Sequence, residues 1–293
     1  MSTIPLAKPL NIYKLDFPVL VSIKYDGVPV RIDIDGHGNW TVQSRQGKDV
    51  PAVHTLVDEF VRCYTNPKLA LDCTLPVTLV GEVLQRGNRF ADFKKTSGVV
   101  RKQTDQADLL EIHLFECDMP GGYEERYNWM EQELFHLHPH VHVVEQELTI
   151  NENYTIQHII AMQEMYPKAE GFVIRNSNDP WAPGKRSWGY QRYLIEPTID
   201  LRIVGFEEAI DKHGRPKNMV GGLIAEYKGE KIGIGPGKLT HQERIELWDD
   251  WCACAGIADI GIAQIKYKKD DSYDAPRQAT FQFWRADKGT PDA

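Results

Sequence analysis

Apolar positions along the chain recur mostly at a spacing of two or in short unbroken runs, a pattern typical of strands. In residues 28–34, for example, Val28, Val30 and Ile32 alternate with other residues. The same reasoning predicts six β-rich segments in the first part of the chain: 19–23, 28–34, 77–84, 111–117, 141–149 and 170–175. Two segments near 52–64 and 155–166 have the spacing expected of helices.

From residue 200 onward the pattern changes to short strands and one predicted helix near 240–251, and two further strands end in FQFWRADK. That is the inventory of a small five-stranded barrel of the OB type. The preceding segments indicate antiparallel sheets with helices packed outside them. The sequence therefore predicts an α+β protein with two domains, a larger one at 1–199 and an OB-fold domain at 200–293.

Composition is consistent with two folded cores, because the 293 residues are 42% hydrophobic. No run of about 18 apolar residues is present, and the N-terminal MSTIPLAKPLN lacks the apolar stretch of a signal peptide. The five cysteines are odd in number and form no CxxC pair, so we expect reduced thiols. These features predict a soluble, intracellular protein of the cytoplasm, and they leave a virus-encoded origin open.

The net charge of −8 argues against a protein that wraps nucleic acid by bulk attraction, since phosphate binding depends on Lys and Arg. Two local clusters of positive charge remain as candidates for such binding. One is FKKTSGVVRK at 93–102, and the other is KYKK at 266–269.

Lys24 stands at the end of an apolar strand and directly before an Asp-Gly turn, in the stretch VSIKYDGVPVRIDI. A free lysine has a pKa of about 10.4 and is a poor nucleophile unless burial or neighbouring cations disfavour its charged form. Taken alone, K-x-D-G is typical of a solvated hairpin residue. Companion motifs are needed to give Lys24 a chemical role.

Five segments follow Lys24 in order: SRQGK at 44–48, LVGEVL at 79–84, LFECDMP at 114–120, EGFVIRN at 170–176 and RQATFQFWRADK at 277–288. Together with Lys24 they resemble the collinear motifs of the covalent nucleotidyltransferases, and specifically of the ATP-dependent DNA ligases. The segments FADFKKTSGVVRK and IDLRIVGF resemble the short bacteriophage type. The resemblance covers about residues 18–288. It implies that residues 1–199 form a nucleotidyltransferase (adenylation) domain.

The resemblance implies roles around ATP for single residues. Lys24 would attack the α-phosphate, release pyrophosphate and carry AMP as a phosphoramidate. Glu82 is similar to the glutamate that holds the ribose hydroxyls, and Phe115 to the aromatic residue that stacks on adenine. Glu170 resembles the carboxylate that places a divalent metal, here Mg²⁺, and Arg45 resembles the arginine next to the nucleotide and nick phosphates.

The C-terminal R-x-D-K of the family matches Arg285, Asp287 and Lys288, which implies that these residues orient the leaving pyrophosphate. Without the family name, Arg285 and Lys288 read as an ordinary charged tail. Glu82 is harder to assign to structure alone, because a carboxylate in an apolar strand costs free energy unless it has a partner. Phe115 is equally compatible with a place in the core.

Two motifs depart from the family form. The first motif, K-x-D-G-x-R, has Pro29 at the arginine position, and Arg31 lies two residues later, displaced by about 6.6 Å on the same strand face. The motif K-x-K before the second domain aligns with Arg192 and Leu194, so that one cation is kept as Arg192. Two readings stay open at the nick: Arg31 substitutes for the missing arginine, or the contact there has changed. Arg192 can still neutralise the α-phosphate.

Arg175 is left out of the predicted site. It lies five residues from Glu170, and an odd separation in a regular strand sends two side chains to opposite faces.

The predicted partner is nicked duplex DNA, sealed by a monomer with 5′-phosphate and 3′-hydroxyl ends as substrate. The basic cluster supplies the expected phosphate contacts, through Lys94, Lys95, Arg101 and Lys102. An RNA ligase or an mRNA-capping nucleotidyltransferase stays open as an alternative, because it uses the same lysine. A nick-binding protein without the reaction is a more remote one.

Two other motifs carry less weight. GIGPGKLT at 233–240 fails as a phosphate loop, because Ile232 and Leu239 stand where glycine and a hydroxyl are required. HLHPHVHVV places histidines 136, 138, 140 and 142 at period two, as a zinc or nickel site on a strand would. Pro139 interrupts such a strand, so we interpret the segment as a connection between a helix and a strand.

Overall fold

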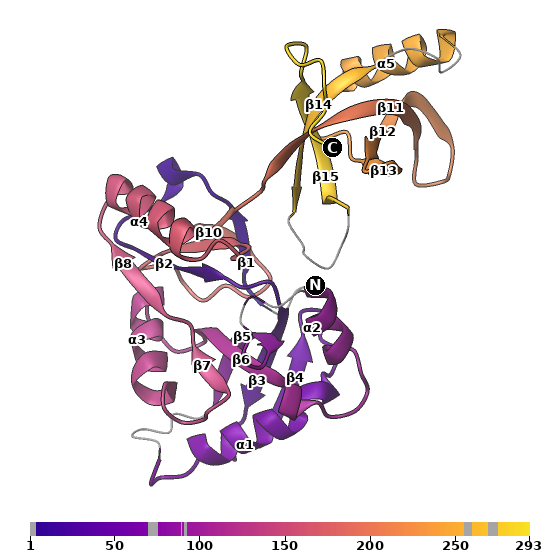
Figure 1. Ribbon diagram of the computed structural model, residues 1–293. Coiled ribbons are helices and arrows are strands. Elements are labelled where there is room, and N and C mark those ends of the chain that lie inside the picture. The colour runs from indigo at the N-terminus through magenta and orange to yellow at the C-terminus, as the bar shows by residue number, and fades with distance from the viewer. Residues whose placement is uncertain (1–3, 70–75, 89, 91–92, 255–259, 269–274) are drawn as a thin grey trace. The chain divides into compact units, whose positions relative to one another are not determined.

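The computed structural model describes residues 4–69, 76–88, 90, 93–254, 260–268 and 275–293. These fall into two compact units, Met1–Leu194 and Ile195–Ala293, which are described separately (Figure 1). Within the described ranges, none of the helices has the length and apolar character needed to span a bilayer.

In the first unit, the part of the chain that the structure describes forms two five-stranded sheets. The first sheet has the order β1 (Leu6–Pro9), β10 (Arg186–Leu194), β9 (Gly171–Asn176), β2 (Val19–Lys24) and β8 (Gln146–Thr149). The second has the order β4 (Trp40–Ser44), β3 (Val28–Ile34), β5 (Val77–Gln85), β6 (Leu110–Cys117) and β7 (Val141–Val143). The β1–β10 and β6–β7 pairs are parallel, and every other neighbouring pair in these two sheets is antiparallel.

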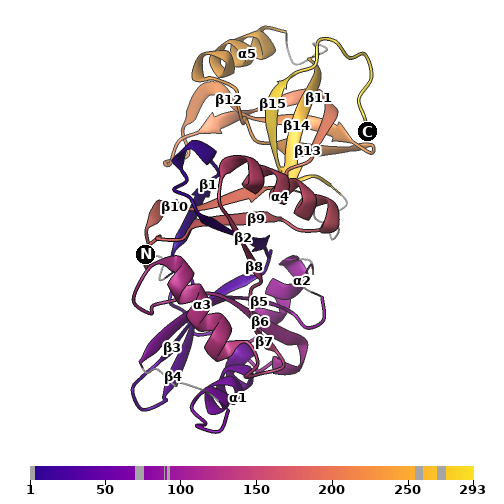
Figure 2. The same ribbon diagram turned by 90° about the vertical axis from the view of Figure 1, so that its left-hand side faces the viewer.

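The described residues of this unit form four helices: α1 (His54–Tyr64), α2 (Phe93–Val100), α3 (Tyr123–Leu134) and α4 (Glu152–Met165). Short 3₁₀ turns occupy Ile12–Lys14, Pro51–Val53 and Ala107–Leu109. Figures 1 and 2 show α1 and α3 beside the second sheet and α4 beside the first. Helix α1 buries Leu56, Val57, Phe60 and Val61, whose spacing of three and four makes one apolar face toward the core. Each such burial stabilises the fold by about 1.5–3 kcal/mol.

Outside the gaps at 255–259 and 269–274, the second unit consists of one antiparallel sheet and one helix. The sheet order is β13 (Glu230–Ile234), β12 (Pro216–Tyr227), β11 (Thr198–Ile210), β14 (Gly261–Lys268) and β15 (Arg277–Trp284). Helix α5 (His241–Ala253) follows β13. It begins at a capping box in which the Thr240 hydroxyl accepts from the Glu243 N–H and the Glu243 carboxylate accepts from the Thr240 N–H.

The predicted α+β class is confirmed, and the mixture of sheets with few helices matches it. The predicted β-rich segment 141–149 contains two strands, of which β7 joins the second sheet and β8 the first. Strands β1, β4 and β10 and helices α2 and α3 were not predicted from the pattern. The predicted connection before β7 is present, since α3 ends at Leu134 and β7 begins at Val141.

Candidate active site

Lys24 lies at the last position of β2, where it pairs in register with Gly171, the first residue of β9. Its Nζ donates a hydrogen bond to Oε2 of Glu170, the residue directly before β9. Both groups are mostly buried, with side-chain exposures of 27% and 11%. The strand pairing therefore brings together two residues that are 146 positions apart in the sequence.

Glu82 lies on β5, opposite Pro29 of β3. The Gly27 N–H, from the turn after Lys24, donates to its carboxylate. A side chain at Gly27 would meet the Val83 carbonyl oxygen at 2.3 Å and Cγ of Glu82 at 2.8 Å, so the turn requires glycine at this close approach. The turn thus holds the carboxylate of Glu82 near the Lys24 strand.

The electrostatics of Lys24 and Glu82 are coupled. Burial raises the pKa of Glu82 to about 8, although the positive charge of Lys24 opposes this shift. Burial alone would lower the pKa of Lys24, but the carboxylates of Glu170, Glu82 and Asp26 outweigh it and hold that pKa above its ordinary value. Lys24 is therefore an ammonium group surrounded by three acidic side chains, and its nucleophilic form requires that this negative charge be compensated.

Carboxylate oxygens are the donors that Mg²⁺ prefers in proteins. Glu170 and Asp26 together provide more negative charge than Lys24 neutralises, and the carboxyl of Glu82 adds further oxygen donors. This excess of negative charge fits a divalent cation bound at Glu170, the residue predicted to hold Mg²⁺.

Arg175 and Tyr190 also belong to this part of the fold, and the sequence reasoning left them out. Glu170 precedes β9, so strand alternation does not apply to it. Arg175 pairs with Leu20, and Leu20 lies four residues before Lys24 on β2. Arg175 therefore lies on the same face of the sheet as Lys24. Its guanidinium lies 4.4 Å from the ring centroid of Tyr190. It also pairs with Glu116 of β6, which connects the two sheets. Tyr190 lies two residues before Arg192 on β10, so alternation along that strand places it on the same face as the predicted Arg192 and could have identified it.

The other predicted residues of the first unit lie on or next to β3, β4, β6 and β10. The Arg31 guanidinium is directed to the Asp33 carboxylate, with Nη2 and Oδ1 2.7 Å apart. Arg45 is exposed in the turn after β4. Phe115 is partly buried at an irregularity of β6, where the pairing with β5 skips one residue. The Arg192 Nη1 donates to the Ala7 carbonyl at 3.3 Å.

The predicted basic cluster lies on and just after α2. Its four cations, Lys94, Lys95, Arg101 and Lys102, are all exposed. The other cluster, 266–269, is only partly within the described residues: Lys266 forms an ion pair with Glu196, and residue 269 lies outside them. Cys73 lies outside them as well.

The three predicted C-terminal residues form one ion-pair cluster within the second unit. Asp200 accepts from Arg285 Nη1 at 2.5 Å and from Lys288 Nζ at 2.8 Å. Asp287 accepts from Arg285 at 2.9 Å, a contact that lowers the pKa of its carboxyl to about 2. Lys288 Nζ also contacts Asp292 at 2.5 Å. Asp200, from β11, thus positions both cations.

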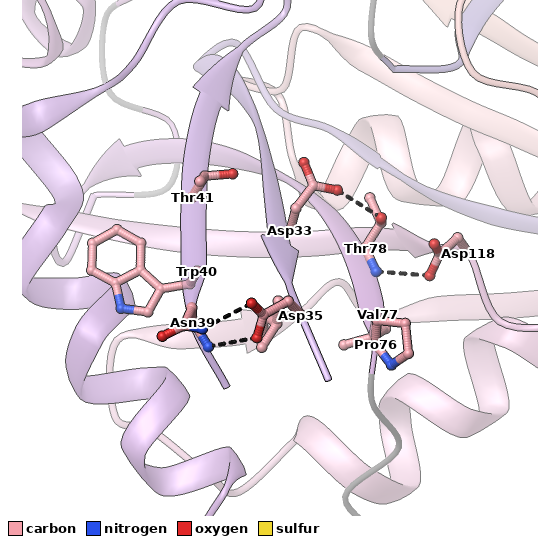
Figure 3. Close-up of a pocket in the computed structure, with 10 residues that line it drawn as sticks. Asp33, Asp35, Asn39, Trp40, Thr41, Pro76, Val77, Thr78 and Asp118 are labelled. Atoms are coloured by element: carbon pink, nitrogen blue, oxygen red, sulfur yellow. Dashed lines mark hydrogen bonds between the residues drawn. The ribbon is translucent and has the colours of Figure 1, made fainter. Parts of the chain in front are cut away.

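A pocket of about 330 Å³ lies at the far end of β3 from Lys24. Figure 3 shows Asp33, Asp35 and Asp118 around it, with Trp40 at one side. Asp33 lies four residues along the strand from Pro29, roughly 13 Å at about 3.3 Å per residue. None of the predicted site residues lines this pocket.

Comparison with a protein-family model decides the family. Residues 5–193 match the model described as ATP dependent DNA ligase domain. The chain belongs to the ATP-dependent DNA ligase family. The predicted family and enzyme class, an ATP-dependent DNA ligase that joins DNA, are thereby confirmed. No curated protein sequence matches the chain.

Solved structures show that the ligase fold extends over almost the whole chain. The structure named Pmar-Lig_Pre has a TM-score of 0.75 at 19% identity, over 97% of this chain and 67% of that one. A structure from a study of DNA binding by Lig E DNA ligases has a TM-score of 0.66 at 19% identity, over 97% and 100%. The ATP-dependent DNA ligase of bacteriophage T7, in complex with ATP, has 0.53 at 16% identity, over 97% and 98%. At these identities the likeness concerns the fold.

Proposed function

We propose that this ligase seals nicks with 5′-phosphate and 3′-hydroxyl ends in duplex DNA through a covalent lysyl-AMP at Lys24. The observation that carries the proposal is the contact of Lys24 with Glu170, beside Glu82, in a chain of the ATP-dependent DNA ligase family. A buried lysine whose pKa is shifted by specific charged neighbours is a candidate functional group. It becomes a nucleophile once the negative charge that keeps it protonated is compensated.

In the first step the partly exposed Lys24 ammonium gives its proton to water, and Nζ forms a bond to the α-phosphorus of ATP while the bond to pyrophosphate breaks. AMP then moves to the 5′-phosphate of the nick, which releases Lys24. The 3′-hydroxyl finally attacks that phosphate and displaces AMP. These transfers need positioning and charge stabilisation more than acid-base groups. Glu82 would hold the ribose hydroxyls, Phe115 would stack on adenine, and Arg45 and Arg192 would contact phosphates.

Glu170 is the residue proposed to hold Mg²⁺. The bound ion would neutralise negative charge on the phosphates and favour the deprotonated amine. The chain's own contribution is to fix Glu170 directly before β9, in contact with Lys24.

The domains proposed are a nucleotidyltransferase domain at 1–199 and an OB-fold barrel at 200–293. Support for the barrel comes from the strand order β13-β12-β11-β14-β15 and from an additional bridge between Gly235 and Thr280, which relates the two outer strands. In this proposal Arg285 and Lys288, oriented by Asp200 and Asp287, bind the leaving pyrophosphate.

Nicked duplex DNA would be bound by the exposed cations of the α2 segment, Lys94, Lys95, Arg101 and Lys102, and by Arg31 at the nick. To bind the nick, Arg31 would have to replace its hydrogen bond to Asp33 with a contact to a DNA phosphate.

Intact-mass measurement after incubation with ATP and Mg²⁺ tests the proposal. The wild-type chain is expected to gain the mass of one adenylate, and Lys24→Ala none. The exposed Lys68→Ala, outside every motif named above, serves as the matched control and retains the adduct. An adduct of unchanged yield in Lys24→Ala would contradict the proposal. Parallel incubations with GTP, and sealing assays on nicked DNA and nicked RNA duplexes, separate the ligase from a capping enzyme and an RNA ligase.

A further inference from the structure

Glu111, His113 and His142 converge on one face of the second sheet of the first unit. Glu111 and His113 are two residues apart on β6, so their side chains share a face. His142 of β7 pairs in register with His113 in the parallel ladder, which places it on the same face. Their potential ligand atoms all lie within 4.8 Å of one another.

The carboxylate of Glu111 stands between the two imidazoles. Its Oε1 lies 2.9 Å from Nε2 of His113, and its Oε2 lies 4.0 Å from Nε2 of His142. The Gly87 N–H donates to Oε2 at 3.2 Å, which orients the carboxylate from the other side. Glu111 and His113 are 7% and 6% exposed, whereas the His142 side chain is 39% exposed. Two of the three side chains are thus buried, and the cluster is open to solvent at His142.

The donor set favours a transition ion over Mg²⁺ or Ca²⁺. Imidazole nitrogen suits zinc, nickel, cobalt and copper, whereas Mg²⁺ and Ca²⁺ prefer oxygen donors throughout. Zinc binds imidazole nitrogen and carboxylate oxygen at about 2.0–2.2 Å, so tetrahedral ligands lie about 3.4 Å apart. The present separations of 2.9 and 4.0 Å bracket that value, and small side-chain rotations would equalise them.

We propose that Glu111, His113 and His142 form a binding site for one divalent transition ion of the zinc class, with its remaining coordination position open to water. The site is distinct from Glu170, and it does not depend on the proposed function of Lys24.

Only one of the four histidines in HLHPHVHVV belongs to this site. The ring of His138 lies 3.5 Å from a carboxylate oxygen of Glu59, and His136 packs against Phe135. The other two ligands come from β6, about thirty residues earlier, which is why the histidine spacing alone does not identify the site.

An ion at this site would stabilise the first unit and hold the ring of His113. That ring packs against Tyr25, with centroids 4.9 Å apart, and Tyr25 directly follows Lys24. On β5, Glu82 is the register partner of His113. Occupancy would therefore fix the sheet next to the candidate active site.

Dialysis of the full-length protein tests the proposal without ATP or DNA. Metal-stripped chain is equilibrated with Zn²⁺ in the presence of millimolar Mg²⁺, and bound zinc is measured by elemental mass spectrometry. Wild-type protein is expected to retain one zinc ion per chain and to gain thermal stability with zinc. His142→Ala, which changes a half-exposed side chain, should bind at least about tenfold more weakly, since loss of even an outer-shell partner costs about 10–100-fold.

The double variant His136→Ala/His140→Ala is the matched control, because it removes two nearby histidines outside the cluster. It should retain zinc as the wild type does. His113→Asn provides a second loss-of-ligand variant, and Co²⁺ titration followed by visible absorption reports the ligand geometry directly. No zinc on the wild-type chain, or equal zinc on wild type and His142→Ala, would overturn the proposal. Failure of the Lys24 adduct in the separate mass experiment would leave it unaffected.

Discussion

The ammonium of Lys24, the last residue of β2, donates a hydrogen bond to the carboxylate of Glu170, which lies directly before β9. The carboxylate is the largest of the contributions that raise the pKa of Lys24, and burial acts in the opposite direction. In the free protein, Glu170 therefore keeps the amine protonated. A phosphate-bound cation at Glu170 would remove that influence when ATP is present.

Glu170→Gln is expected to lower the pKa of Lys24, because burial remains while the main stabilising charge is lost. Lys24 should then react faster with an amine-specific acylating reagent at neutral pH, as measured by peptide mass spectrometry. Glu147→Gln, which changes an exposed carboxylate outside the site, should leave the rate at Lys24 unchanged. Slower labelling in Glu170→Gln would show that the carboxylate does not control the amine.

Glu82 should make the stability of the protein depend on pH. Burial raises its pKa from 4.5 to about 8, so the folded chain keeps a proton that the unfolded chain loses above its own pKa. The stability that comes from this proton is fully present below pH 4.5 and is lost as the pH rises through about 8.

Glu82→Gln cannot titrate and should therefore gain stability relative to wild type between about pH 5 and about pH 9, by a few kcal/mol at most. Melting temperatures of both proteins over this range measure the effect. A constant difference between them across the range would mean that Glu82 is charged in the folded protein at all these values.

The strands that carry the reacting groups could be predicted from sequence, because Val30, Ile32 and their neighbours alternate clearly and Lys24 ends an apolar run. The pairing of those strands could not. Lys24 meets Glu170 through the β2–β9 register, and a non-local register of this kind leaves no local pattern. The rule of alternation also misplaced Arg175, because Glu170 lies outside the strand to which the rule applies.

Helix α3 shows why some elements were missed. Its inner face consists of Tyr123, Arg126, Tyr127, Met130 and Leu134, which have helical spacing but include a buried arginine. In a hydrophobic pattern Arg126 counts as a polar residue, so it interrupts the apolar periodicity that would have predicted the helix. In the structure it is fully buried because Glu116 accepts from its Nε at 2.8 Å. A charge with a partner from another element cannot be distinguished from an exposed one by sequence pattern alone.

Glu116 should be essential for the stability of the first unit, because it is fully buried and pairs with both Arg126 and Arg175. Glu116→Gln leaves two buried guanidinium groups without their shared negative charge, and the expected loss is about 3–5 kcal/mol. Chemical denaturation measures it. The exposed pair Arg62–Asp58 supplies the control, since Arg62→Ala should cost only about 0–1 kcal/mol. Equal costs for the two variants would contradict the structural role assigned to Glu116.

Lys288→Ala should impair the formation of lysyl-AMP more than the sealing of DNA that already carries AMP. The proposed partner of Lys288 is pyrophosphate, which leaves only in the first step. Loss of one cation aimed at developing negative charge typically costs about 10²-fold or more in rate. Single-turnover adenylylation and sealing of a pre-adenylylated nick separate the steps. Lys231→Ala, an exposed lysine of β13, is the control, and equal losses in both steps would exclude a role confined to pyrophosphate.

Lys94 and Lys95 should contact DNA phosphates, because both are exposed at the start of α2 in a chain whose net charge is −8. Each phosphate contact that is lost reduces the slope of log affinity against log salt by about 0.9. Lys94→Ala/Lys95→Ala is therefore expected to reduce the slope for nicked DNA by about 2, as measured by titration at several salt concentrations. Arg62→Ala/Lys68→Ala removes the same charge from exposed positions near the end of α1 and should leave the slope unchanged. If both double variants change the slope equally, general charge accounts for the salt dependence and the α2 contacts are excluded.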